Sequence, residues 1–76
     1  MRKSLIEIVN TVRINKGQDQ IYKINPNLNL RNDLGFTSLD LAELTVRIEK
    51  EYGIDIFEDG LIYTVAQIQQ KLGLNE

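Results

Sequence analysis

The sequence predicts an all-α fold: a small antiparallel bundle of three main helices plus one short helix, with a long loop between the first two helices. Apolar residues recur at the spacing of three or four that is typical of an amphipathic helix. Capping residues and glycines bracket the helical segments, and no candidate strand has a clear partner. The 76 residues, 42% hydrophobic and 26% charged, are typical of a single globular domain covering residues 1–76.

The first helix is expected to begin near Arg2 or Ser4 and to end at Ile14. Gly17 follows closely, and glycine readily adopts the left-handed conformation that closes helices. Polar residues occupy one face of this segment, and the apolar positions on the other face are Leu5, Ile8, Val9 and Val12.

Residues 18–37 are predicted to form the long connection, because turn-forming residues surround Pro26 and occupy positions 32–33. Residues 21–24 also fit a short strand, but without a partner strand we favour a loop or a single helical turn. A loop of this length in a small domain needs anchoring. Side chains that turn into the core would provide it, and the candidates are Ile21, Ile24, Leu28, Leu30, Leu34 and Phe36.

The second helix is the most clearly defined element. Thr37 is a good N-cap, and Asp40 suits the third position of a variant capping box. The helix is expected to end at Tyr52, with Gly53 as its C-cap. Its apolar residues form one stripe of Leu41, Leu44, Ile48 and Tyr52 and a second, shifted stripe of Leu39, Ala42 and Val46. One stripe, together with Ala42, is expected to pack inward, whereas Leu39 and Val46 are expected to stay partly exposed.

The connection after the second helix contains two further segments. Residues 54–56 are predicted to cross the molecule in an extended conformation, with their isoleucines reaching the core. Residues 57–62 are predicted to form the short helix, a single turn that Gly60 weakens.

The last helix is predicted over residues 65–72. Thr64 and Gln67 form a Thr-x-x-Gln capping box at its start, and Gly73 ends it. Its inward face consists of Val65, Ile68 and Leu72.

The composition argues against several kinds of chemistry. The chain has no cysteine and no histidine, which removes disulfides, thiolate metal ligands and the commonest general base. Asp55, Glu58 and Asp59 lack the ligand rhythm of a calcium loop, so no metal site is predicted. No nucleophile–base pair is visible, so no catalytic residues are predicted and the chain is not expected to be an enzyme.

The expected location is the cytoplasm. No apolar run approaches the length of a membrane span. The N-terminal stretch is amphipathic and lacks the uninterrupted apolar segment of a signal peptide.

Charge is distributed unevenly along the sequence. Residues 1–31 carry six cations and two acids, a net +4, whereas residues 38–62 carry seven acids and two cations, a net −5. An acidic segment attracts basic partners and repels nucleic acid. The alternative is an ordinary solvated helix surface.

Ser38 is the main candidate for a functional residue. It directly follows a turn that contains a glycine, at the point where a helix begins, and a helix start is a favourable place for a phosphate. Serine is also common at helix starts for structural reasons, but here Thr37 can do the capping and leaves the Ser38 hydroxyl uncommitted. The surrounding residues are Asp33-Leu34-Gly35-Phe36-Thr37-Ser38-Leu39, followed by Asp40 and Glu43-Leu44.

These residues resemble the phosphopantetheine attachment motif of acyl carrier proteins, roughly Asp-Leu-Gly-x-Asp-Ser-Leu with Glu-Leu following. The helix pattern and the long first loop are similar to that family over nearly the whole chain. The resemblance implies that a phosphopantetheinyl transferase attaches 4'-phosphopantetheine from coenzyme A to Ser38. The thiol of this arm would hold acyl intermediates of fatty-acid, polyketide or other biosynthesis as thioesters, on a monomeric protein that catalyses nothing itself.

The resemblance also implies that biosynthetic enzymes with basic docking patches bind the second helix. Two alternatives stay open: Glu43 and Arg47, four residues apart, pair with each other, and the apolar residues belong to the core. The expected docking residues are Leu39, Asp40, Glu43, Val46 and Glu49.

The chain departs from the family pattern at Thr37, where the family usually has an aspartate. Threonine caps a helix but supplies no negative charge, so recognition by a general transferase is open. The segment 55–63 is also shorter than the third helix of the family. Arg47 and Lys50 reduce the acidity of the second helix.

Two other functions remain candidates. The residues around Ser38 also resemble the thiolation motif of peptide synthetases, which would make the cargo aminoacyl or peptidyl. An unmodified acidic helical adaptor that binds a basic protein partner is the alternative without a cofactor.

Overall fold

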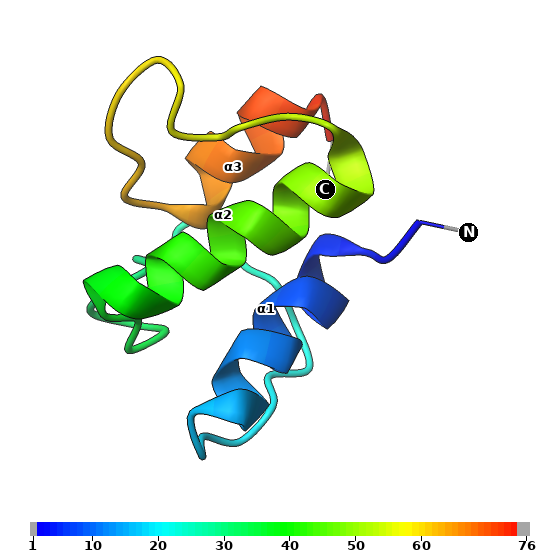
Figure 1. The fold of residues 1–76 in the computed structure, drawn as a ribbon. Helices are drawn as coiled ribbons and strands as arrows, with labels where there is room; N and C mark the ends of the chain where they lie inside the picture. The colour runs from blue at the N-terminus through cyan, green and yellow to red at the C-terminus, as the bar shows by residue number, and fades with distance from the viewer. Residues whose placement is uncertain (1, 75–76) are drawn as a thin grey trace.

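The computed structural model describes residues 2–74. Within this range the chain forms three helices, α1 Leu5–Asn15, α2 Ser38–Tyr52 and α3 Val65–Leu72, and no strand (Figure 1). The α1 and α2 helices pack against each other, and Figure 1 shows the chain running down α1 and returning along α2. The predicted all-α class, the small bundle and the long loop between the first two helices are confirmed. In the described part of the chain, no helix has the length and apolar character needed to cross a bilayer.

Local capping signals define where the helices begin and end. At the start of each helix, the N-cap hydroxyl accepts a hydrogen bond from the backbone N–H of the third helical residue. The side chain of that third residue in turn accepts a hydrogen bond from the backbone N–H of the N-cap residue. Gly53 and Gly73 close α2 and α3 in the left-handed conformation, with φ of 71° and 72°. The boxes predicted for the second and third helices are confirmed, and the three pairs are Ser4 with Glu7, Thr37 with Asp40 and Thr64 with Gln67.

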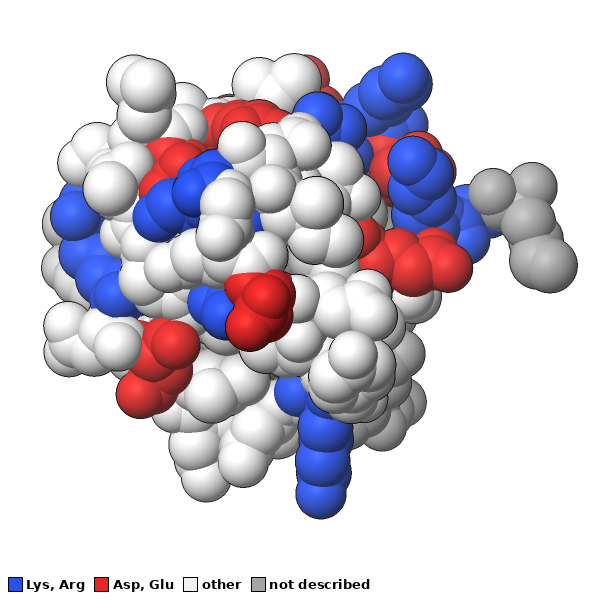
Figure 2. Space-filling model, turned by 90° about the horizontal axis from the view of Figure 1, so that it is seen from below, with Lys and Arg blue, Asp and Glu red and all other residues white. Residues whose placement is uncertain are grey.

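The charge asymmetry of the sequence is partly neutralised in the fold. Lys16, from the basic part of the chain, pairs with Asp40 of the acidic part at 2.7 Å. Lys71 pairs with Asp59 at 2.9 Å. On the face shown in Figure 2, basic and acidic side chains lie interspersed among uncharged residues, so this face has no continuous acidic surface.

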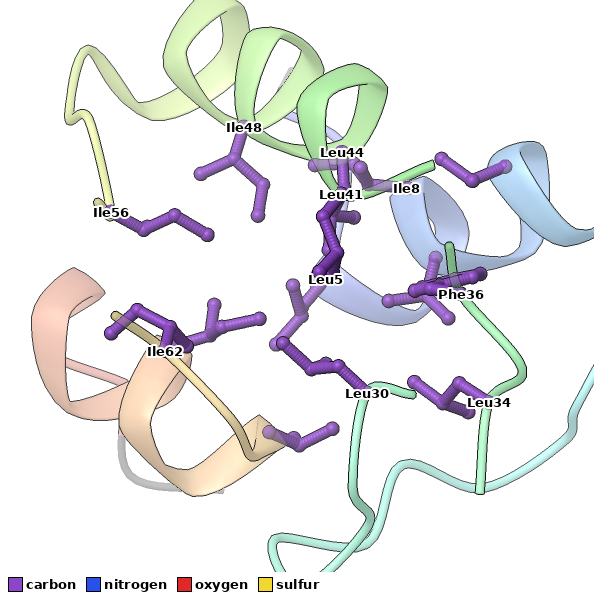
Figure 3. Packing of buried hydrophobic residues seen from close by; sticks show 14 residues of the cluster. Leu5, Ile8, Leu30, Leu34, Phe36, Leu41, Leu44, Ile48, Ile56 and Ile62 are labelled. Atoms are coloured by element: carbon purple, nitrogen blue, oxygen red, sulfur yellow. The ribbon is translucent and has the colours of Figure 1, made fainter. Parts of the chain in front are cut away.

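A single hydrophobic core joins the helices and the loops. Figure 3 shows side chains from α1, α2, α3 and the connecting segments pointing toward one another. Their burial removes apolar surface from water and provides most of the stability of so small a domain. The fully or largely buried residues are Leu5, Ile8, Val9, Val12, Leu30, Leu34, Phe36, Leu41, Leu44, Ile48, Ile56, Ile62, Val65 and Ile68.

The long loop between α1 and α2 is anchored from two sides. Asn10 of α1 donates through Nδ2 to the carbonyl of Ile21 at 2.8 Å and accepts from its N–H at 2.7 Å. Near its other end, the loop pairs with the start of α3 through the N–H of Leu30, which donates to the carbonyl of Tyr63 at 2.9 Å. Residues 21–24 are loop, as favoured above. The anchoring is confirmed: the predicted side chains are buried or pack against the core, namely Ile21, Ile24, Leu28, Leu30, Leu34 and Phe36.

The segment between α2 and α3 forms turns where the short helix was expected. The Asp55 carboxylate accepts a hydrogen bond from the N–H of Phe57 at 2.9 Å and forms an Asx turn at the start of this segment. Gly60 has φ of 141°, outside the helical region, so the turn cannot continue. Ile56 and Ile62 are buried and fix the two ends of this segment.

Replacing Leu30 with alanine should lower the free energy of unfolding by about 2–4 kcal/mol, because an anchoring side chain is lost and a cavity remains. Leu39→Ala removes the same atoms from a side chain that is 82% exposed. It should change the free energy of unfolding by less than about 0.5 kcal/mol. Urea denaturation followed by circular dichroism measures both variants, and equal losses would contradict the anchoring role of Leu30.

Candidate functional site

Ser38 is the first residue of α2, and its side chain is exposed. The neighbouring Thr37 is the N-cap: its Oγ1 accepts from the N–H of Asp40 at 3.3 Å and lies 3.0 Å from Asp40 Oδ2, to which it donates. The Thr37 hydroxyl is therefore engaged in capping. The Ser38 hydroxyl serves no capping function and accepts a hydrogen bond from Arg31 Nη2 at 2.8 Å.

The turn before α2 is held by side chains of the motif itself. Asp33 accepts a hydrogen bond from the N–H of Asn29 at 2.7 Å through Oδ2. Asn29 in turn accepts through Oδ1 from the N–H groups of Arg31 at 2.9 Å and Asn32 at 2.8 Å. These reciprocal bonds satisfy the backbone of the turn, as Asx turns do. The motif aspartate thus has a structural function, and Leu34 beside it is buried in the core.

Gly35 forms part of this turn in the left-handed conformation, and the side chain of Gln18, in the loop after α1, lies close to it. The Gly35 φ of 71° lies in the left-handed region, and a Cβ at this position would lie 2.8 Å from Gln18 Nε2. Arg13 donates through Nη1 to the carbonyl of Leu34 at 2.7 Å, and Lys16 donates to the carbonyl of Gly35. Two cations at the end of α1 therefore hold the backbone just before Ser38.

Asp40 connects the same end of α1 to α2. Its Oδ2 lies 2.7 Å from Lys16 Nζ and accepts from the N–H of Thr37 at 2.8 Å. The hydrogen bond from Lys16 and then the one from the Thr37 backbone hold the pKa of the Asp40 carboxyl below its ordinary value. Asp40 was predicted as a partner-binding residue, and it has these structural contacts in addition.

The other predicted docking residues differ in their solvent exposure and in the ion pairs that they form. Leu39 is 82% exposed and Val46 68% exposed, so neither belongs to the core. Ala42 was expected to pack inward, but it is exposed as well. Glu43 lies 2.8 Å from Arg47 Nε, as the four-residue spacing predicted, and also accepts from Asn15 at 3.3 Å. Glu49 is exposed and has no ion pair within residues 2–74.

A shallow apolar hollow lies beside Ser38, between α2 and the segment that leads to α3. Among its lining residues are Leu41, Phe57 and Leu61, and Leu61 is 70% exposed. Arg31 lines the same hollow. These residues and Lys16 were not predicted as site residues, because their approach to Ser38 depends on loop conformation and has no periodic signal in the sequence.

Comparisons with known proteins point to one family. The family described as "Phosphopantetheine attachment site" matches residues 14–70. Acyl carrier protein 2, mitochondrial, from Arabidopsis thaliana is 44% identical over 34 residues, which cover 45% of this chain and 27% of that protein. An acyl carrier protein from Solidesulfovibrio magneticus is 40% identical over 37 residues, 49% of this chain and 47% of that protein. The match therefore spans less than half of either relative. No solved structure matches the chain significantly.

The contribution of Asp40 to stability should depend on pH. Because its pKa is lower in the folded than in the unfolded chain, the ionised carboxylate stabilises the fold fully above the ordinary value of 3.8. This stabilisation is lost as the pH falls through the lowered folded pKa. The difference in unfolding free energy between the wild type and Asp40→Asn should thus stay constant at neutral pH and shrink below about pH 4. Urea denaturation at a series of pH values measures it.

Lys16→Met tests whether the contact with Lys16 is what lowers the pKa of Asp40. Removing the ammonium should raise the pKa of Asp40 toward its ordinary value, since Lys16 is the largest cause of the shift. An NMR titration of the Asp40 carboxyl carbon measures this pKa. An unchanged titration curve would show that the Lys16 contact does not stabilise the carboxylate.

Proposed function

Because the chain belongs to the acyl carrier protein family, whose members are non-catalytic carriers with covalently attached 4'-phosphopantetheine, we propose that Ser38 is the attachment residue of this chain. The observation that carries the proposal is the exposed Ser38 hydroxyl at the start of α2, inside the matched residues 14–70. The adjacent Thr37 hydroxyl is occupied by Asp40. This arrangement favours modification of Ser38 alone.

The residues around Ser38 fit a phosphodiester. The backbone N–H groups at a helix start carry partial positive charge, which stabilises an anion there. The nearest acid in sequence, Asp40, is paired with Lys16, so its charge is compensated. Arg31 adds a guanidinium that already reaches the Ser38 hydroxyl. When bound, the cofactor would supply a thiol, which a chain without cysteine lacks.

Attachment requires only the serine side chain from this protein. In this reaction the Ser38 Oγ would bond to the phosphorus of the phosphopantetheine phosphate of coenzyme A, and the bond from that phosphorus to 3',5'-ADP would break. The serine proton would be taken up by the phosphopantetheinyl transferase. The contribution of the fold is to keep Oγ exposed and its position defined, through the Thr37 cap and the turn closed by Asp33.

The proposed cargo is an acyl group held as a thioester for biosynthetic enzymes, for example those of fatty-acid or polyketide synthesis. The apolar hollow beside Ser38, lined by Leu41, Phe57 and Leu61, favours a hydrocarbon chain over an aminoacyl group. The names of both relatives, which are acyl carrier proteins, agree with this choice. The tether would raise the effective concentration of the cargo at a docked enzyme.

The proposed docking surface is the outer side of α2. Leu39 and Val46 provide exposed apolar contacts, and Glu49 provides an acid without an intramolecular partner in the described residues. Asp40 and Glu43 add negative charge to the same helix, but their ion pairs reduce the field that a basic patch would sense. We therefore propose that apolar contact contributes more to docking than charge does.

Residues 1–76 would act as one monomeric carrier domain. A cytoplasmic location stays a prediction, since one of the two relatives is named as a mitochondrial protein.

Incubation with coenzyme A, magnesium and a broad-specificity phosphopantetheinyl transferase should increase the intact mass by one phosphopantetheine. Ser38→Ala should abolish the gain, because the accepting oxygen is lost. The matched control is Ser4→Ala, which removes the other serine, also at a helix start, where it acts as an N-cap. A wild-type protein that gains no mass with any transferase tried would favour the unmodified adaptor.

Leu39→Ala should raise the KM of the transferase for this protein by about 5- to 30-fold, as expected for the loss of a largely buried leucine contact on docking. Tyr22→Ala is the control, because Tyr22 is 85% exposed but lies in the loop between α1 and α2. Steady-state kinetics of cofactor transfer measures both variants. Equal KM values for Leu39→Ala and the wild type would refute docking through this residue.

A further inference from the structure

We infer that Arg31 is a positioning residue for the cofactor arm, and that its guanidinium binds the phosphodiester attached to Ser38. This inference rests on the proposed attachment at Ser38. Its basis is the hydrogen bond from Arg31 Nη2 to Ser38 Oγ, with a length of 2.8 Å. The phosphorus would be bonded directly to that oxygen, so the anionic phosphate oxygens are two bonds from an atom that Arg31 already contacts.

Arg31 has donors to spare for this phosphate. A guanidinium carries five N–H donors, and it binds phosphate oxygens through parallel, charge-assisted hydrogen bonds. Within residues 2–74, no carboxylate lies within ion-pair distance of Arg31. By contrast, Lys16 and Arg47 are both paired with acids. Arg31 is thus an uncompensated cation beside the hydroxyl that would become negatively charged.

The backbone at Arg31 is held firmly enough to give this contact a defined direction. The Arg31 N–H donates to Asn29 Oδ1 at 2.9 Å, and its carbonyl accepts from the N–H of Gly35 at 3.0 Å. The preceding residue, Leu30, is completely buried. Only the side chain of Arg31 is therefore free to adjust, and less conformational entropy is lost when it binds.

The position of Arg31 also indicates what the contact would do. Arg31 lies on the loop side of Ser38 and lines the apolar hollow together with Leu61. An arm whose phosphate is bound by Arg31 would start beside this hollow. Arg31 would thereby bias the direction of the arm, in addition to neutralising its charge.

The test compares the unmodified and fully modified forms of the wild type and of Arg31→Gln, with loading verified by intact mass. Thermal unfolding gives the change in Tm on modification for each protein. The change in the wild type should exceed that in Arg31→Gln by about 2–6 °C, the size expected for one partly exposed charge-assisted contact in a domain of this length. The excess should shrink in about 1 M NaCl, because salt screens the pair.

Lys50→Gln is the matched control. It removes one positive charge from α2 at a position 12 residues after Ser38, and thus about 18 Å along the helix. The change in Tm on modification should be the same in Lys50→Gln as in the wild type. Arg31→Lys should retain part of the change, since it keeps the charge and loses the planar fork. The ³¹P chemical shift of the modified protein provides a second readout, which should differ between the wild type and Arg31→Gln.

Failure of the inference and failure of the proposed function give different results. If the wild type is not modified, the attachment at Ser38 is wrong and the inference with it. If all proteins are modified, but Arg31→Gln shows the same Tm change and ³¹P shift as the wild type, only the inference is wrong. A purely structural role of Arg31 would lower the Tm of both forms equally, and this outcome also contradicts the inference.

Discussion

The position of Ser38 depends on the ion pair between Lys16 and Asp40. Through this pair, the end of α1 is joined to the first turn of α2, and the same ammonium also binds the carbonyl of Gly35 in the preceding turn. Asp40 can therefore hold Thr37 in the cap while its own charge is compensated. Since the cap is complete without Ser38, the Ser38 hydroxyl remains exposed to solvent. This partly buried contact thus links α1 to the helix start and to the turn on either side of the candidate attachment residue.

Much of the fold was predictable because its signals are local. A threonine followed by Asp or Gln three residues later and a glycine after the last turn define α2 and α3 almost to the residue. The Glu43–Arg47 pair followed from spacing alone. The short helix after α2 is not formed, because Gly60, with φ of 141°, ends the turn of residues 56–59 before a helix can develop. Helix propensity over so few residues is a weak signal.

The candidate site was predictable in its central residue but not in its surroundings. Ser38 stands out through its place after a capping residue, whereas Arg31 and Lys16 approach it by way of irregular backbone. Among the predicted docking residues, Leu39 and Val46 are separated from the inward stripe as expected, whereas the pairing of Asp40 with Lys16 had no signal in the sequence. A count of acidic residues on a helix does not reveal how many of them are compensated by cations from elsewhere in the chain.

The contribution of α1 to the core has a consequence for protein engineering. The family match begins at residue 14, near the C-terminal end of α1, yet α1 supplies Leu5, Ile8 and Val9 to the interior. A carrier grafted into another protein as the matched stretch alone would leave an uncovered apolar cleft along α2. Such a chimera would retain the recognisable motif but not the scaffold that orients it. The transplantable unit therefore has to include α1.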